Sequence, residues 1–230
     1  MPRSPGRENR KDNTRKLLEP RWLIVCEGEK TEPNYFNGLS DFLNQNGSNK
    51  IKIHAEGIGK NTSSLVDHAE EYFTFYDKLR GKSLIPPYKR VIFAFDKDSF
   101  GDDQFNSAIK KAQSLCPSSI VAWSNESFEL WLCLHYDLVN AARGRHDYNN
   151  KITEIFRKQG ICNNKQRYEK GDVNLFDKIL KSGGNIENAI TNAEKLVSDK
   201  DLSSPAKINP ATMMHKAVKA LATEAGYNFI

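Results

Sequence analysis

The spacing of apolar residues divides this chain into a first part with mixed periodicity and a second part with helical periodicity only. Short apolar or alternating runs predict strands at residues 22–26, 51–59, 90–96 and 118–125. Helical spacing predicts helices between and after them, at residues 31–47, 63–81, 103–115 and 126–136. Strands that alternate with helices are typical of a parallel sheet covered by helices. We therefore predict an α/β fold with a parallel sheet of about four strands.

Beyond about residue 140 the strand pattern disappears. The remaining segments with a regular apolar period are helical, at residues 152–160, 172–183, 185–198 and 212–226. We predict no further strand in this part. The chain should then consist of a basic flexible arm (1–19), an α/β core (20–140) and a helical extension (141–230) that packs on or beside the core.

The composition fits one core and narrows the cellular location. The 230 residues are 38% hydrophobic and 27% charged, which suits one domain with an appendage. No apolar run reaches about 18 residues, and no apolar stretch follows the basic start, so we expect neither a membrane span nor a secretory signal. Four cysteines without metal-site spacing predict reduced, buried thiols in a cytoplasmic protein. The oligomeric state stays open between a monomer and a homo-oligomer.

Most of the net charge lies in the first sixteen residues. They hold six basic and two acidic side chains, which gives them +4 of the chain's formal +5 and leaves the rest close to neutral. A basic arm suits a polyanion partner such as RNA or DNA. A solvated tail without a function is the alternative.

Acidic residues follow three of the predicted strands. Glu27 comes after the first strand, Asp96 and Asp98 after the third, and Glu129 shortly after the fourth. The carboxyl ends of parallel strands share one edge of a sheet, where ligands bind, so these side chains should converge. Asp96 and Asp98 should face the same side, with Lys97 pointing elsewhere, because the strand period is two. Carboxylates this close repel one another unless a cation neutralises them, and oxygen ligands favour Mg²⁺.

Three of these acids also have a simpler explanation. Asp96 and Asp98 could cap the following helix or pair with surface lysines, and Glu129 lies where a helix dipole favours an acid. The order of the strand-end motifs favours a metal site, because a strand that ends in Glu-Gly precedes one that ends in Asp-x-Asp. The histidines are scattered along the chain, so the sequence offers no cluster for zinc.

Four strings along the chain resemble the RloB-like family, whose members are found in bacterial restriction and phage-defence gene neighbourhoods. They are LIVCEGEKTEPNYF, FAFDKDSF, SNESFELWLCLHY and NPATMMHKAV. The order of Glu-Gly and Asp-x-Asp is also similar to the Toprim domain, the Mg²⁺-binding α/β fold of topoisomerases, bacterial primases and OLD-family nucleases. The resemblance covers nearly the whole chain and implies a Toprim-like sheet.

The resemblance further implies roles for particular residues. Glu27 would be a catalytic metal ligand or general acid–base, and Asp96 and Asp98 would hold Mg²⁺, with Mn²⁺ as the alternative ion. Glu129 and Lys170 would act in catalysis, with Lys170 as a phosphate ligand, whereas a surface lysine at a helix start is the alternative for Lys170. The residues implied in substrate binding are Lys30, Glu32, Asn125 and Arg167.

Together these features predict a metal-dependent nuclease that cleaves RNA, with tRNA as one candidate, or DNA in bacterial anti-phage defence and abortive infection. The metal ion would stabilise charge on the phosphate and activate the attacking oxygen. The chain has no GxxxxGK[ST] motif, so an ATPase needed for activation would be a separate partner, as would other products of a restriction locus. Two alternatives stay open. They are a non-catalytic regulatory subunit that binds nucleotides or nucleic acid, and a Mg²⁺-dependent phosphohydrolase of small molecules.

Overall fold

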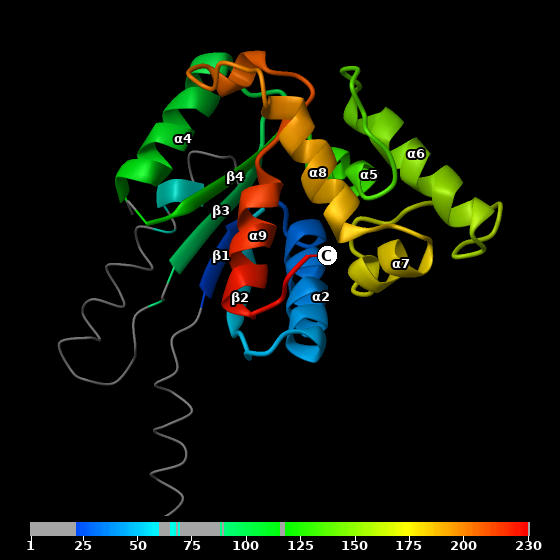
Figure 1. Cartoon of the computed structure of the whole chain (residues 1–230). Coiled ribbons are helices and arrows are strands. Elements are labelled where there is room, and N and C mark those ends of the chain that lie inside the picture. The colour runs from blue at the N-terminus through cyan, green and yellow to red at the C-terminus, as the bar shows by residue number, and fades with distance from the viewer. Residues whose placement is uncertain are drawn as a thin grey trace, which may run out of the picture.

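A mostly parallel sheet forms the centre of the molecule (Figure 1). The computed structural model describes residues 22–59, 65–67, 69, 88, 90–115 and 118–229. The strands are β1 (Trp22–Cys26), β2 (Ile53–Gly57), β3 (Arg90–Asp96), β4 (Ile120–Asn125) and β5 (Ala211–Thr212). They lie in the order β2-β1-β3-β4-β5, in which only β5 is antiparallel to its neighbour. The predicted α/β fold with a parallel sheet is confirmed.

Helices cover both faces of this sheet (Figure 1). Their bounds are α2 (Thr31–Asn46), α4 (Asp102–Leu115), α5 (Phe128–Leu134), α6 (Arg145–Lys158), α7 (Leu175–Lys181), α8 (Ile186–Val197) and α9 (Met214–Glu224), with a 3₁₀ turn η1 at Pro205–Lys207. None of the helices in the described part of the chain has the length and apolar character that a membrane crossing requires.

Burial of both sheet faces explains why β1, β3 and β4 are continuous apolar runs rather than alternating ones, whereas the edge strand β2 is only partly buried. Successive side chains of a strand point to opposite faces. Leu23 and Val25 of β1 therefore lie in one apolar cluster with Phe105 of α4. Ile24, between them, lies in the other cluster with Tyr35 of α2.

The direction in which the chain crosses the sheet reverses between β1 and β3. Strand β2, which is reached from β1 through α2, pairs with one edge of β1, whereas β3 pairs with the other edge. The α2 helix packs on one face of the sheet, and α4, which follows β3, packs on the opposite face. Such a reversal opens a crevice at the carboxyl ends of the two central strands, where open α/β sheets bind ligands.

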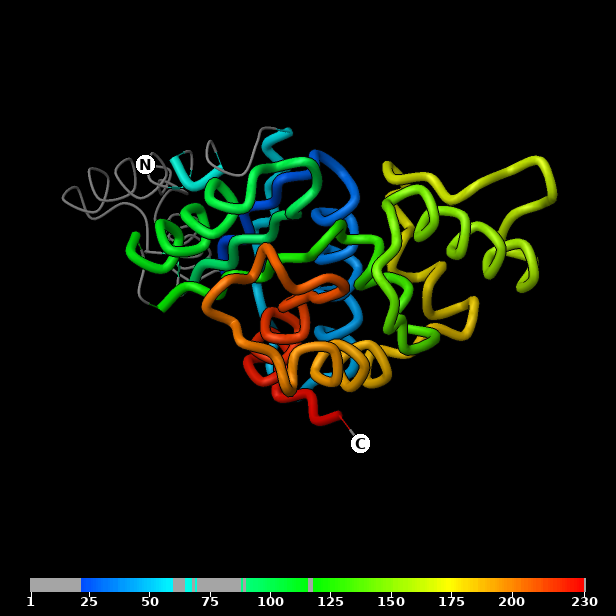
Figure 2. Tube along the Cα trace, turned by 90° about the horizontal axis from the view of Figure 1, so that it is seen from above, coloured from blue at the N-terminus to red at the C-terminus, as the bar shows by residue number. Residues whose placement is uncertain are grey.

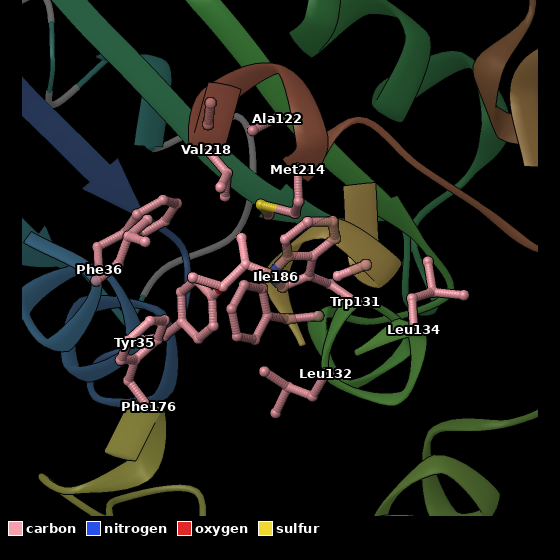
Figure 3. Packing of buried hydrophobic residues seen from close by; sticks show 14 of the residues in the cluster. Tyr35, Phe36, Ala122, Trp131, Leu132, Leu134, Phe176, Ile186, Met214 and Val218 are labelled. Atoms are coloured by element: carbon pink, nitrogen blue, oxygen red, sulfur yellow. The ribbon is translucent and has the colours of Figure 1, made fainter. Parts of the chain in front are cut away.

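The segment after residue 140 shares the core of the sheet. Met214 and Val218 of α9 lie in one cluster with Ala122 of β4 (Figure 3). Phe176 of α7 packs edge-on against Tyr35 of α2, with ring centroids 5.3 Å apart. Figure 2 shows α6 and α7 beside the sheet, next to α2.

The prediction that no strand follows residue 140 is wrong. Strand β5 pairs with the end of β4, where Ala211 lies opposite Asn125 and Thr212 opposite Ser124. Two residues are too few to show an alternating pattern. The predicted helix over 212–226 therefore included Thr212, the second residue of the strand. The helix itself begins at Met214.

Several predicted features lie outside the described residues. They are the basic arm, the thiol of Cys116 and most of the helix predicted at 63–81, of which residues 65–67 and 69 are helical. Cys26 and Cys133 are buried free thiols, as predicted, and Cys162 is a free thiol that is only partly buried.

Candidate functional site

A cavity of about 550 Å³ opens at the carboxyl ends of β1 and β3. Its walls come from the segment after β1, the end of β3, the first turns of α5 and α6, and the loop before α7. The charged side chains in these walls are Glu27, Glu29, Lys30, Glu32, Asp96, Asp98, Glu129, Arg145 and Lys170. The acids that were expected to converge therefore line one cavity, at the place that the sheet reversal selects.

Glu27 connects the ends of the two central strands. Its backbone N–H donates to the carbonyl of Ala94 at 2.9 Å, which continues the parallel ladder beyond β1. Its Oε2 accepts a hydrogen bond from the backbone N–H of Asp96 at 3.1 Å. The carboxylate at the end of β1 is thus held beside the last residue of β3.

Gly28 makes room for a second carboxylate. A Cβ atom at this position would lie 2.1 Å from Oε2 of Glu32, closer than two such atoms can approach. Glu32 lies in the first turn of α2 and is buried. Its Oε2 has no hydrogen-bond partner among the described residues. The Glu-Gly pair in the sequence therefore has a steric cause as well as a chemical one.

Asp96 and Asp98 face the same side, as the alternation predicts. Both form ion pairs with Arg145, whereas Lys97 between them pairs with Asp102 of α4 at 3.3 Å. Asp96 is buried, and Asp98 has a φ of 40°. That value lies in the left-handed region, which residues other than glycine seldom adopt. Backbone strain of this kind is concentrated at binding and catalytic sites.

Two cations reach the carboxylates from the helical part of the chain. The guanidinium of Arg145 places Nη2 3.4 Å from Oδ2 of Asp96, Nη1 3.1 Å from Oδ2 of Asp98 and Nε 4.0 Å from Oε2 of Glu129. Lys170 places Nζ 2.9 Å from Oε1 of Glu129. Since the Glu129 side chain is only 2% exposed, its charge would be costly without these partners.

Burial and crowding raise the pKa values of two acids. Burial, together with the carboxylates of Glu129 and Glu27, raises the pKa of Glu32 from 4.5 to about 7. Burial and the neighbouring carboxylates, with Glu32 first among them, raise the pKa of Asp96 well above its ordinary value. Burial and the crowding of carboxylates thus make both Glu32 and Asp96 harder to ionise.

The donor chemistry of the cluster fits a divalent metal ion. Asp96 Oδ1 and Glu32 Oε2 are buried without a hydrogen-bond partner among the described residues, and carboxylate oxygens are the ligands that Mg²⁺ and Mn²⁺ prefer. In this conformation, no three Asp, Glu, His or Cys side chains of the described residues stand close enough together to hold a metal ion. In this conformation the guanidinium of Arg145 pairs with both Asp96 and Asp98.

The loop that carries Lys170 is fastened to the rest of the site. Thr31 Oγ1 donates to the carbonyl of Lys170 at 2.9 Å. The backbone N–H of Tyr168 donates to Thr153 Oγ1 at 3.1 Å, and the Tyr168 side chain is buried. Lys170 is thus held at the cavity wall in an ion pair with Glu129, rather than extending from a surface helix.

The residues implied in substrate binding are divided between two places. Glu32 and Lys30 both line the cavity, where Glu32 is buried and Lys30 is exposed. Arg167 is exposed and lies outside the cavity lining. Asn125, also outside it, is buried at the end of β4 and donates from Nδ2 to the carbonyl of Ala206 at 2.9 Å, where it positions η1.

Arg145 is the residue that sequence reasoning missed. It follows Asp96 by 49 positions and belongs to no motif. One weak signal was available, since Arg145 directly follows Gly144 at the start of an amphipathic helix. The helix dipole disfavours a cation there, so a nearby anion is expected to compensate.

Comparison with known proteins places the chain in a family. A search of curated proteins and a search of solved structures give no match. The family model for RloB-like proteins matches residues 22–221, a range that includes every residue lining the cavity. Because this match spans most of its length, the chain belongs to the RloB-like protein family.

Proposed function

We propose that this RloB-like protein is a divalent-metal-dependent nuclease that hydrolyses phosphodiester bonds of RNA or DNA. The observation that carries the proposal is the convergence of acids from three neighbouring strand ends on one cavity, in which two cations pair with these acids. The residues are Glu27, Asp96, Asp98, Glu129, Arg145 and Lys170. Carboxylates beside cations suit a reaction on a phosphate, which uses a metal site and further positive charge.

Glu27, Asp96 and Asp98 are the residues that would hold the metal ion. When bound, the ion would neutralise charge on the phosphate and activate the attacking oxygen. The raised pKa of Asp96 supports this assignment, because a bound cation would favour the ionised form that burial and the neighbouring carboxylates disfavour. The hydrogen bond from the Asp96 N–H fixes the orientation of the Glu27 carboxylate.

Lys170 is suited to bind a non-bridging oxygen of the phosphate. Its backbone is tethered by Thr31, and Glu129 orients its ammonium group across 2.9 Å. Glu32, whose pKa is raised to about 7, is suited to accept or release a proton near neutral pH. These residues give the cavity phosphate binding and proton transfer in addition to a metal site.

The substrate class and setting rest on charge and family. The first sixteen residues carry a net charge of +4, which favours a polyanion over a small neutral molecule. The family resemblance implies a setting in bacterial restriction and phage-defence gene neighbourhoods, which supports a role in bacterial defence, and an ATPase needed for activation would be a separate partner.

The proposal is tested by a cleavage assay on end-labelled tRNA, single-stranded RNA and plasmid DNA, with Mg²⁺, Mn²⁺ or EDTA. The protein should cut at least one substrate with metal and none with EDTA. Asp96→Asn should not cut, whereas Asp103→Asn, which alters an exposed aspartate in the first turn of α4, should cut like the wild type. Cutting in EDTA or by Asp96→Asn would overturn the metal assignment. Absence of cutting on every substrate would favour a regulatory subunit that binds nucleic acid.

A further inference from the structure

Arg145 stands where a metal ion would be needed. Its guanidinium contacts Asp96 and Asp98 at 3.4 and 3.1 Å, and its Nε lies 4.0 Å from Glu129. These carboxylates come from the end of β3, the turn that follows it and α5. They would repel one another without a cation between them. The arginine therefore supplies the charge balance that a divalent ion would supply.

The fit of this guanidinium is loose. Charge-assisted N–H···O bonds are about 2.7–2.9 Å long, and arginine commonly pairs with one carboxylate through two such bonds. The contacts of Arg145 are longer and are divided among three carboxylates. Its buried Nε and the buried Oδ1 of Asp96 have no hydrogen-bond partner among the described residues. In a permanent structural ion pair, these two buried atoms would have hydrogen-bond partners. We therefore interpret Arg145 as a cation that fills the place of one that fits these carboxylates better.

Arg145 also has room to leave the carboxylates. Its side chain is 34% exposed and lines the cavity. It begins α6 directly after Gly144, which has nothing within 4 Å of its Cβ position. Rotation about the bonds of this long side chain can carry the guanidinium to the cavity edge while the backbone stays in place. Lys170, in contrast, pairs with Glu129 at a normal 2.9 Å.

We propose that Arg145 and a divalent cation are alternative occupants of the carboxylates of Asp96 and Asp98, which the cation would share with Glu27. In the absence of the cation, the guanidinium neutralises the acids. When the cation binds, Arg145 withdraws to the cavity wall. The inference rests on the proposed function, since it requires the cluster to bind a metal ion. In this scheme, Arg145 weakens metal binding because it competes with the cation for the same carboxylate oxygens.

Mn²⁺ binding to the full-length protein, followed by the electron paramagnetic resonance signal of the free ion, tests this competition. Arg145→Gln should bind Mn²⁺ about tenfold more tightly than the wild type, because the competing cation is gone. Arg143→Gln is the matched control, since it removes an equal charge from an exposed side chain in the loop directly before α6. It should change the affinity by less than about twofold, because solvent screens that charge. Arg145→Lys keeps the charge without the fork geometry and should give an intermediate affinity, which keeps the test decisive if Arg145→Gln does not fold.

The outcomes separate this inference from the proposed function. Equal or weaker Mn²⁺ binding by Arg145→Gln and Arg145→Lys would overturn the competition and leave the metal site intact. No Mn²⁺ binding by any of the proteins would overturn both. Thermal unfolding gives a second readout, since Arg145→Gln should melt below the wild type in EDTA and recover when Mn²⁺ is added. If Arg145→Gln and Arg143→Gln had the same melting temperature in EDTA, the guanidinium of Arg145 would not neutralise the cluster.

Discussion

The Glu27 carboxylate accepts a hydrogen bond from the backbone N–H of Asp96 across 3.1 Å. The residue after β1 is thus attached to the last residue of β3 by its side chain as well as by the backbone ladder. One carboxylate both fastens the two strand ends and faces the cavity. Suitable variants can separate these two roles.

Glu27→Gln should lose activity and keep stability. A glutamine Oε1 can still accept the hydrogen bond from Asp96, but it lacks the charge that a metal ligand or proton acceptor needs. Cleavage should therefore fall by about 100-fold or more, while urea unfolding stays close to that of the wild type. Glu27→Ala removes both roles and should also destabilise the protein by about 1 kcal/mol. A Glu27→Gln protein that cuts at the wild-type rate would contradict the catalytic assignment.

The metal-free protein should lose stability as the pH rises from about 4.5 to about 7. The pKa of Glu32 is about 7 in the folded protein against an ordinary value of 4.5, so the folded state binds more protons in this range. The stabilisation is complete below pH 4.5 and is lost as the pH rises through 7, with a total of about 3 kcal/mol at most.

Urea unfolding in EDTA at a series of pH values measures this dependence. Glu32→Gln should reduce the slope, because it removes one of the two acids whose pKa is raised, the other being Asp96. Glu154→Gln, which alters an exposed glutamate on α6, should keep the wild-type slope. If the curve of Glu32→Gln matched that of Glu154→Gln, Glu32 would not be one of the titrating groups.

Gly28→Ala should damage the site, whereas Gly101→Ala should not. The new Cβ at position 28 would lie 2.1 Å from the buried carboxylate of Glu32, so that side chain must shift. Overpacking of this kind costs about 1–3 kcal/mol and should reduce cleavage as well. At position 101 the nearest atom is Oε1 of Gln104 at 3.7 Å, which is ordinary contact. Thermal unfolding and cleavage rates of both variants check this, and equal effects at the two positions would contradict it.

Deletion of residues 1–16 should weaken nucleic-acid binding and make it less sensitive to salt. Each lysine or arginine that contacts a phosphate releases counterions, so removing six of them lowers the slope of affinity against salt concentration. Fluorescence anisotropy with labelled RNA and DNA at several salt concentrations measures both quantities. A full-length variant with all six basic residues changed to glutamine separates charge from length. Wild-type affinity and slope in both proteins would identify the segment as a solvated tail.

The strand-end acids could be predicted because a parallel sheet leaves little freedom in where they lie. Hydrophobic runs identified the strands, and the pleat placed Asp96 and Asp98 on one side with Lys97 on the other. The steric role of Gly28 could not be predicted, since it depends on where α2 places Glu32. The sequence pattern showed that a glycine follows Glu27 but not which side chain needs the space.

Two other features could not be predicted because they depend on packing between distant segments. Arg145 reaches the carboxylates only because α5 and α6 pack against each other, and no local pattern encodes that contact. Strand β5 consists of two residues and exists through its pairing with β4. A segment this short carries no periodicity of its own, so tertiary contacts alone decide its conformation.

The last helix closes the core, and this has a consequence for how the protein is made. Met214 and Val218 of α9 lie in the same apolar cluster as Ile24 of β1 and Ala94 of β3. A nascent chain that has left the ribosome only as far as residue 200 contains every acid of the site but lacks β5 and α9. Part of one apolar face of its sheet is then open to water, so β1 and β3 lack some of the packing that stabilises them in the complete chain. A protein with the proposed nuclease activity would therefore complete its core only after β5 and α9 have left the ribosome, whose RNA lies close to the growing chain.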